Sequence, residues 1–237
     1  MNPLLSVDIN GAGYEKKNPT IQNIRFQISR GELVGLIGPN GAGKSTTIQS
    51  ILGLLEYTDG NIEWEEGVRV SYIPEKPLYY DDLTLREHID FLLTIENTYN
   101  DQSLHLADEL LALFKLTDFQ DQLPATYSKG MQQKGMIILA MMTRPDFYII
   151  DEPFIGLDPN ATKKLLELLK KEMERGVGIL MSTHVLDTAE KICDRFLLVN
   201  KGEILAQGRL EELQNKAESP NLSLLDVFEQ LTQGASA

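Results

Sequence analysis

The sequence has 237 residues, of which 42% are hydrophobic, so it is long enough to bury the core of one large domain. Its formal net charge of −13 argues against a nucleic-acid partner, because acidic surface repels phosphate. The single cysteine, Cys193, excludes an intrachain disulfide and favours a reducing compartment. We expect no signal peptide, and no apolar run reaches the roughly 20 residues that span a bilayer, so a membrane role would come through a partner.

The first third of the chain has the pattern of a strand, a glycine loop and a helix. Residues 21–28 alternate like a strand, and ELVGLIG at 32–38 is a continuous apolar run typical of a strand buried on both faces. GPNGAGKST follows this run, and residues 46–55 have helical periodicity. A further strand is expected at 68–75, ended by Pro74.

The middle of the chain is dominated by helical patterns. LTLREHIDFLL and LHLADELLALFKL have the helical period, and Thr84 with Glu87 forms a capping box at the start of the first. A third helix is expected after Ser128. We therefore predict a helical subdomain at 77–145, inserted into a core made of residues 1–76 and 146–237.

The last third returns to alternating strands and helices. Strands are expected at 147–150 and 178–184, an amphipathic helix at 161–176, a hairpin at 195–208 that turns at 200–202, and helices from 209 and around 222–228. The predicted fold class is α/β, with a mostly helical insert.

The glycine loop matches G-x-x-x-x-G-K-[ST] through Gly38, Gly43, Lys44 and Ser45. Glycines let backbone N–H groups turn inward around a phosphate, and the following helix points its positive end at the same group. Lys44 would supply a cation to the β and γ phosphates of a bound nucleotide, and Ser45 a hydroxyl to Mg²⁺. The alternative is a glycine turn with a solvated lysine, but a buried strand before the loop and a helix after it favour phosphate binding.

A second pair of candidates ends the apolar strand FYII. Asp151 and Glu152 would emerge at the carboxyl end of that strand, where ligands bind in open α/β sheets. Asp151 suits the Mg²⁺ shell, and Glu152 could orient or deprotonate a water that attacks the γ-phosphate. Acidic residues also end strands as solvated turns, so the functional interpretation depends on the glycine loop.

Five motifs follow one another in the order GPNGAGKST, YSKGMQQK, FYIIDEP, GLDP and STH. With these motifs the chain resembles the nucleotide-binding subunit of an ATP-binding cassette (ABC) transporter, over essentially its whole length from Tyr14 onward. The resemblance implies a P-loop NTPase (RecA-like) core with an antiparallel β subdomain and an α-helical subdomain. It also implies that two such subunits pair head to tail with two ATP molecules between them.

The resemblance assigns YSKGM to the signature loop, residues 127–131, which caps the γ-phosphate on the opposite subunit. Ser128 would offer a hydroxyl and Gly130 would allow close backbone approach. Lys129 and Met131 replace the first glycine and the glutamine of the usual Leu-Ser-Gly-Gly-Gln. Ser128 also fits a plain helix N-cap.

Three more residues take family roles by their places in these motifs. His184 would hydrogen-bond the γ-phosphate, and Tyr14 would stack on adenine, although a tyrosine there could equally serve packing. Asp158 would contact the opposite subunit's site and is also well placed as an N-cap before Pro159. His88 and His105 are expected to be structural or exposed.

Glu75 departs from the family, which usually has a glutamine that touches Mg²⁺ and senses the membrane partner. A carboxylate can approach Mg²⁺ but cannot donate a hydrogen bond unless protonated. SYIPE, EHIDF and YSKGMQQK together resemble Ecs-type and other ABC-2-type bacterial transporter ATPases.

The predicted site falls into three groups. The catalytic residues expected are Lys44, Glu152 and His184, and the Mg²⁺ contacts expected are Ser45, Glu75 and Asp151. The nucleotide contacts expected are Tyr14, Gly38, Pro39, Asn40, Gly41, Ala42, Gly43, Lys44, Ser45, Thr46, Ser128, Gly130 and Asp158.

The function expected is an ATP-hydrolysing subunit on the cytoplasmic face of the membrane. It would power a separate membrane-spanning permease, of exporter type by the subfamily resemblance, paired with a second copy of itself or with a paralogue. The alternatives are a soluble regulatory ABC ATPase, a relative acting on DNA or ribosomes, and a small-molecule P-loop kinase. Such DNA or ribosome relatives usually carry long inserts or two cassettes, and a kinase would lack the signature loop.

Overall fold

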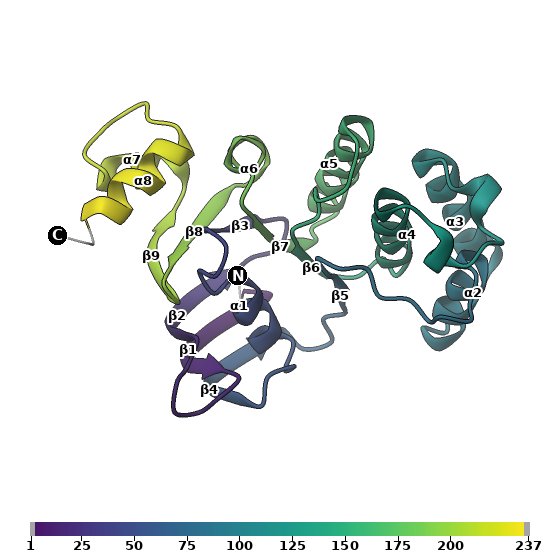
Figure 1. Ribbon diagram of the computed structural model, residues 1–237, viewed down its shortest axis with the longest axis horizontal. Coiled ribbons are helices and arrows are strands. Elements are labelled where there is room, and N and C mark those ends of the chain that lie inside the picture. The colour runs from purple at the N-terminus through teal and green to yellow at the C-terminus, as the bar shows by residue number, and fades with distance from the viewer. Residues whose placement is uncertain (1–2, 235–237) are drawn as a thin grey trace. The chain divides into compact units, whose positions relative to one another are not determined.

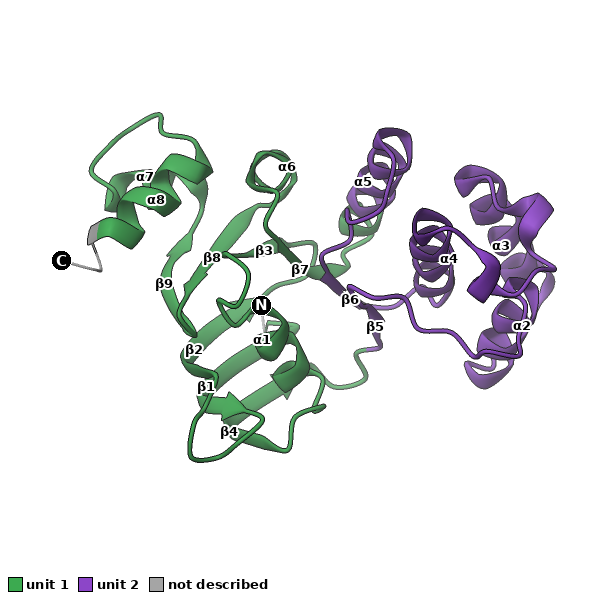
Figure 2. Cartoon of the chain, viewed as in Figure 1, with its two compact units in different colours: residues 1–68, 172–237 green, residues 69–171 purple. Residues whose placement is uncertain are grey.

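The computed structural model describes residues 3–234, which form two compact units (Figure 2). Within the described residues, unit 1 comprises 3–68 and 172–234, and unit 2 comprises 69–171. Unit 2 contains strands as well as helices and extends beyond residues 77–145 on both sides. The helical subdomain predicted at 77–145 therefore stays a prediction. No helix in the described part of the chain is long and apolar enough to cross a membrane.

Unit 1 contains an antiparallel sheet and a second group of strands that are mostly parallel (Figure 1). The antiparallel sheet has the order β2–β1–β4, with β1 at Leu5–Gly13, β2 at Ile21–Ile28 and β4 at Tyr57–Trp64. This sheet is the antiparallel subdomain that the family resemblance implies. The sequence patterns indicated only β2 directly, because β1 carries two glycines and β4 exposes most of its residues.

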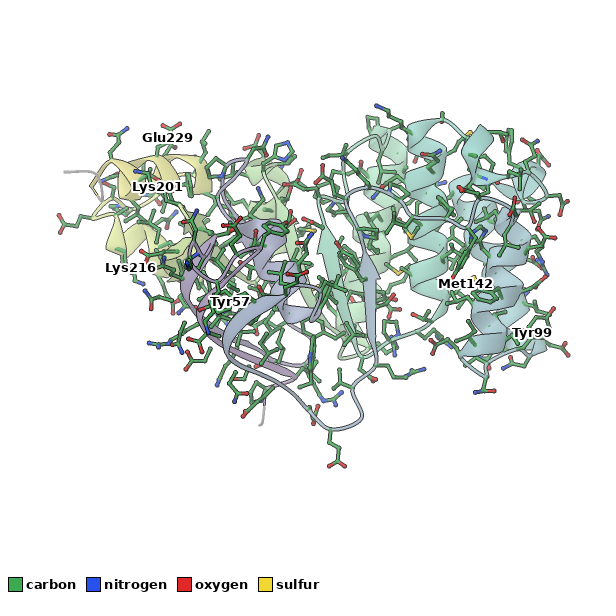
Figure 3. The ribbon with its side chains drawn as sticks, turned by 60° about the horizontal axis from the view of Figure 1, so that its bottom comes forward. Tyr57, Tyr99, Met142, Lys201, Lys216 and Glu229 are labelled. Atoms are coloured by element: carbon green, nitrogen blue, oxygen red, sulfur yellow. The ribbon has the colours of Figure 1, made fainter. Side chains whose placement is uncertain are left out.

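The parallel strands of unit 1 are centred on β3 (Leu33–Ile37). It pairs in parallel with β7 (Gly178–Thr183) and with β8 (Arg195–Asn200). Every residue of β3 and β7 is buried, which explains their unbroken apolar sequences. The hairpin partner β9 (Glu203–Gly208) is antiparallel to β8, and the predicted turn lies at Lys201 (labelled in Figure 3) and Gly202, which both have positive φ.

Four helices accompany these strands. They are α1 (Lys44–Ile51), α6 (Leu186–Ile192), α7 (Leu210–Lys216) and α8 (Leu224–Gly234). Leu213, Leu224 and Val227 of the last two helices are fully buried in a cluster with Phe196 and Leu198 of β8. Helix α6 was not expected, because its short sequence buries only Ala189.

Unit 2 combines two parallel strands with a group of helices. Strand β5 (Val70–Ile73) pairs with β6 (Phe147–Asp151), whose residues are all buried. The helices are α2 (Leu85–Ile95), α3 (Asp101–Phe114), α4 (Lys129–Met142) and α5 (Pro159–Glu174), the last of which continues into unit 1. The Thr84–Glu87 capping box is confirmed at α2, and Met142 (Figure 3) is buried at the end of α4.

Candidate functional site

The glycine loop joins β3 to α1 through a turn that tolerates no side chain at two positions. A Cβ on Gly38 would lie 2.3 Å from the carbonyl oxygen of Val199. A Cβ on Gly43 would lie 2.6 Å from Cγ2 of Ile21, and Gly43 has a φ of 106°. Gly202 braces the loop from the β8–β9 hairpin, donating its N–H to the Ala42 carbonyl at 2.9 Å. Contacts within the chain therefore define the shape of the loop.

Lys44 lies inside this loop with only 6% of its surface exposed. Its Nζ donates to the carbonyl oxygens of Gly38 at 2.8 Å and Pro39 at 3.3 Å. Helix α1 begins at the same residue with a glycine N-cap, no side-chain capping bond and no acidic residue in its first turn. An ammonium beside an uncapped helix N-terminus fits an anionic group such as a phosphate.

The other predicted residues of unit 1 surround the loop or follow β7. Pro39, Asn40 and Gly41 are exposed, Ala42 and Thr46 are buried, and Ser45 is half-buried. Tyr14 is 64% exposed and donates its hydroxyl to Oε1 of Gln49 on α1 at 3.0 Å. This bond holds the ring beside the helix that the loop opens. His184 is exposed directly after β7.

Unit 2 carries the two predicted carboxylates at the end of β6. Asp151 is 3% exposed and Glu152 is 6% exposed. Glu152 has a φ of 49°, in the left-handed region that residues other than glycine seldom adopt. Such a backbone costs about 1–3 kcal/mol and is concentrated at functional sites, where it directs a side chain. The carboxyl end of β6 is therefore a strained turn, which the sequence did not reveal.

The negative charges of Glu75 and Asp151 both affect the pKa of one tyrosine on β5, Tyr72. Burial, together with the negative charges of Asp151 and Glu75, raises the pKa of Tyr72 to about 12. Tyr72 is paired with Ile149 of β6 in the parallel register. The structure thus brings two of the three predicted Mg²⁺ contacts within electrostatic range of one side chain. Carboxylate oxygens of this kind are suitable ligands for Mg²⁺.

The signature loop ends at the N-terminus of α4. Ser128 is exposed, has an extended backbone and accepts a hydrogen bond from the N–H of Met131 at 3.3 Å, which confirms its predicted fit as an N-cap. Gly130 packs against the loop after β6, because a Cβ there would lie 2.6 Å from the carbonyl oxygen of Gly156. Gly130 is therefore required by packing inside this chain, independently of any phosphate.

Asp158 also ties that loop to α4. It accepts a hydrogen bond from the N–H of Ala161 at 2.9 Å, which confirms it as the N-cap of α5, and one from Nζ of Lys134 at 2.6 Å. The bond from Lys134 is the largest cause that lowers the pKa of Asp158 to about 2. Lys134 was missed because its partner lies 24 residues away, and only its place in the YSKGMQQK motif could have indicated it.

The two remaining histidines of the chain fit the expectation of structural or exposed roles. His88 is 6% exposed and hydrogen-bonded on both ring nitrogens. His105 is exposed on α3, beside Glu109.

Comparison with known proteins identifies the family to which this arrangement belongs. The family model described as ABC transporter matches residues 21–155, a span that contains the glycine loop, the signature loop and both carboxylates. The chain belongs to the ABC transporter family.

Relatives of this family match nearly the whole chain. The ABC transporter ATP-binding protein YthP of Bacillus subtilis (strain 168) is 50% identical over 234 residues, covering 99% of each chain. The ABC-type transporter ATP-binding protein EcsA of the same organism is 41% identical over 240 residues, covering 97% of each. A solved structure of the ATP-binding subunit of an ABC transporter has a TM-score of 0.91 at 39% identity, covering 97% of this chain and 99% of that one.

These matches confirm three of the sequence predictions. The fold is that of an ABC ATPase with a P-loop NTPase core, and the chain is an ABC transporter ATP-binding subunit. The resemblance to Ecs-type ATPases is confirmed by the similarity to EcsA. ATPase activity is what membership of this family implies.

Proposed function

We propose that the chain binds ATP with Mg²⁺ at the glycine loop and hydrolyses it to drive transport through a separate membrane-spanning permease. The observation that carries the proposal is the enclosure of Lys44 by the Gly38 and Pro39 carbonyls at the head of an uncapped helix. Membership of the ABC transporter family makes ATP the expected anion.

Individual residues take defined roles in this proposal. The N–H groups of residues 40–46 and the Lys44 ammonium bind the phosphates, with the Tyr14 ring against adenine. Ser45, Asp151 and Glu75 hold Mg²⁺, which neutralises phosphate charge when bound. Glu152 orients or deprotonates the attacking water, and His184 holds the γ-phosphate. The low exposure of Glu152 and its directed backbone support that role.

The proposal also includes a second ATP-binding subunit, identical or paralogous. Ser128 and Gly130 of each subunit would complete the nucleotide site of the other, and Asp158 would lie beside them. In this chain the Gly130–Gly156 packing and the Lys134–Asp158 ion pair connect these elements, so they would be presented to a partner together.

The permease would place this subunit at the inner face of the cell membrane, attached through protein contacts. The partner is expected to be a multi-spanning membrane protein, and the ABC-2-type resemblance of SYIPE, EHIDF and YSKGMQQK favours export.

The permease partner can be tested by affinity purification of the tagged chain from detergent-solubilised native membranes, followed by mass spectrometry. We expect one multi-spanning membrane protein to be recovered in stoichiometric amount. The matched control is the same purification from the soluble fraction. Recovery from that fraction alone, without an integral membrane protein, would favour a regulatory ATPase with no transport role.

A further inference from the structure

Tyr79 connects the segment that follows β5 to the helix that follows the signature loop. It lies four residues after Glu75, and its hydroxyl donates to the carbonyl oxygen of Gln132 on α4 at 2.5 Å. Burial of the ring raises the pKa of Tyr79 far above its usual value. The hydroxyl therefore keeps its proton and remains a donor.

The hydroxyl occupies a notch in α4 that only a glycine leaves open. A Cβ on Gly135 would lie 2.5 Å from the Tyr79 oxygen, but 3.6 Å from the ring carbon that carries it. The next nearest side chain, Leu85, would be 3.5 Å away, an ordinary contact. A glycine inside a helix costs about 1 kcal/mol relative to alanine, so this one has a packing reason.

The tyrosine ring is held from α2 as well. His88 meets it edge-on, with ring centroids 5.2 Å apart. Nε2 of His88 accepts the N–H of Tyr80 at 2.9 Å, so Nδ1 carries the proton and donates to the Thr84 carbonyl at 2.8 Å. Two consecutive residues of the segment, Tyr79 and Tyr80, thus both contact this histidine.

We propose that Tyr79 is a positioning residue for ATP hydrolysis: its hydroxyl, seated at Gly135, sets the position of the first turn of α4 relative to the segment that carries Glu75. That turn carries Ser128 and Gly130, which would complete the partner subunit's nucleotide site. The inference rests on the proposed function. The bond to Gln132 lies one turn after Ser128, close enough to fix where the helix begins.

Three variants test this fit: Tyr79→Phe, Gly135→Ala and the two combined. Gly135→Ala should increase amide hydrogen exchange at residues 129–133 in the parental protein, because the new Cβ displaces the hydroxyl. In the Tyr79→Phe background the same change should reduce exchange, because the clash is gone and alanine favours the helix. The control is Tyr80→Phe, since Tyr80 is 60% exposed and engages His88 through its backbone and ring face.

ATP turnover is measured on the same set, together with binding of a fluorescent ATP analogue to each variant alone. We expect Tyr79→Phe to lower kcat by about two- to tenfold, the value of one hydrogen bond, while KM and nucleotide affinity change by less than about twofold. Gly135→Ala should lower kcat further, and the double variant should recover at least to the level of Tyr79→Phe.

Two results would overturn the inference while the proposed function stands. The first is that Gly135→Ala changes hydrogen exchange and kcat equally in the parental protein and in the Tyr79→Phe variant. The second is that Tyr80→Phe lowers kcat as much as Tyr79→Phe does. If the parental chain hydrolyses no ATP with any partner subunit, the proposed function fails and Tyr79 has no reaction to position. The exchange measurements need no turnover, so they separate the two failures.

Discussion

Gly43 closes the turn before α1 with a backbone that a side chain disfavours. Its φ is 106°, and a Cβ would also meet Ile21 at 2.6 Å. Gly41 has a φ of 79°, but a Cβ there would meet nothing within 4 Å. A side chain at position 41 would therefore face only the free-energy cost of the left-handed backbone. A side chain at position 43 would face that cost and a steric clash as well.

We expect Gly41→Ala to lower the free energy of unfolding by about 1–2 kcal/mol, the cost of a left-handed alanine. Gly43→Ala should lower it further, by about 1–3 kcal/mol more, because the loop must also move away from Ile21. Urea unfolding of both variants measures the difference. Equal losses would show that the Ile21 contact imposes no constraint.

Local patterns predicted most of the candidate residues, because each lies beside a recognisable strand end or helix start. Lys44 follows an apolar strand and a glycine loop, and Asp151 follows another such strand. The left-handed backbone of Glu152 and the contact between Gly130 and Gly156 were beyond prediction. Both depend on how segments distant in sequence pack, and residue type alone does not encode that.

The start of α5 combines a helix cap with an ion pair at Asp158. Because its folded pKa is lowered to about 2, its charge stabilises the fold above the ordinary aspartate pKa, near 4. That contribution fades as the pH falls below about 4 and is lost only below about 2, where the carboxylate is protonated in both states.

Asp158→Asn keeps the cap and removes the charge, whose largest partner is Lys134. We expect the variant to be less stable than the parent at pH 6, with the difference shrinking as the pH falls below about 4. Urea unfolding at several pH values measures it, and Lys134→Met should reproduce the profile. A difference that does not change with pH would assign the stability to the cap alone.

At the scale of elements, buried strands and capped helices were predicted, whereas exposed or glycine-rich strands were not. β3 and β6 are entirely buried, so their apolar runs indicated them. β4 has only half-buried and exposed residues, and β1 contains Gly11 and Gly13. The pairing of β1 with both β2 and β4 is decided by tertiary contacts that no single segment records.

The whole molecule carries the residues of an ATP-hydrolysing cassette in both of its units. Unit 1 holds the glycine loop, Tyr14 and His184, and unit 2 holds the carboxylates and the signature loop. We propose that these residues together hydrolyse ATP and that Glu152 acts on the attacking water. Glu152→Gln replaces one carboxylate oxygen by an NH₂ group. The side chain keeps nearly the same shape but can no longer act as a base.

The most direct test is steady-state ATP hydrolysis by the parental chain and by Glu152→Gln, with Mg²⁺ and with the membrane partner where one is recovered. We predict that Glu152→Gln lowers kcat by at least about a hundredfold, as expected for loss of a general base, while ATP still binds and still promotes pairing of two subunits. Lys44→Ala is the matched control, and it should lose binding as well as turnover. Hydrolysis by Glu152→Gln at the parental rate would contradict the account.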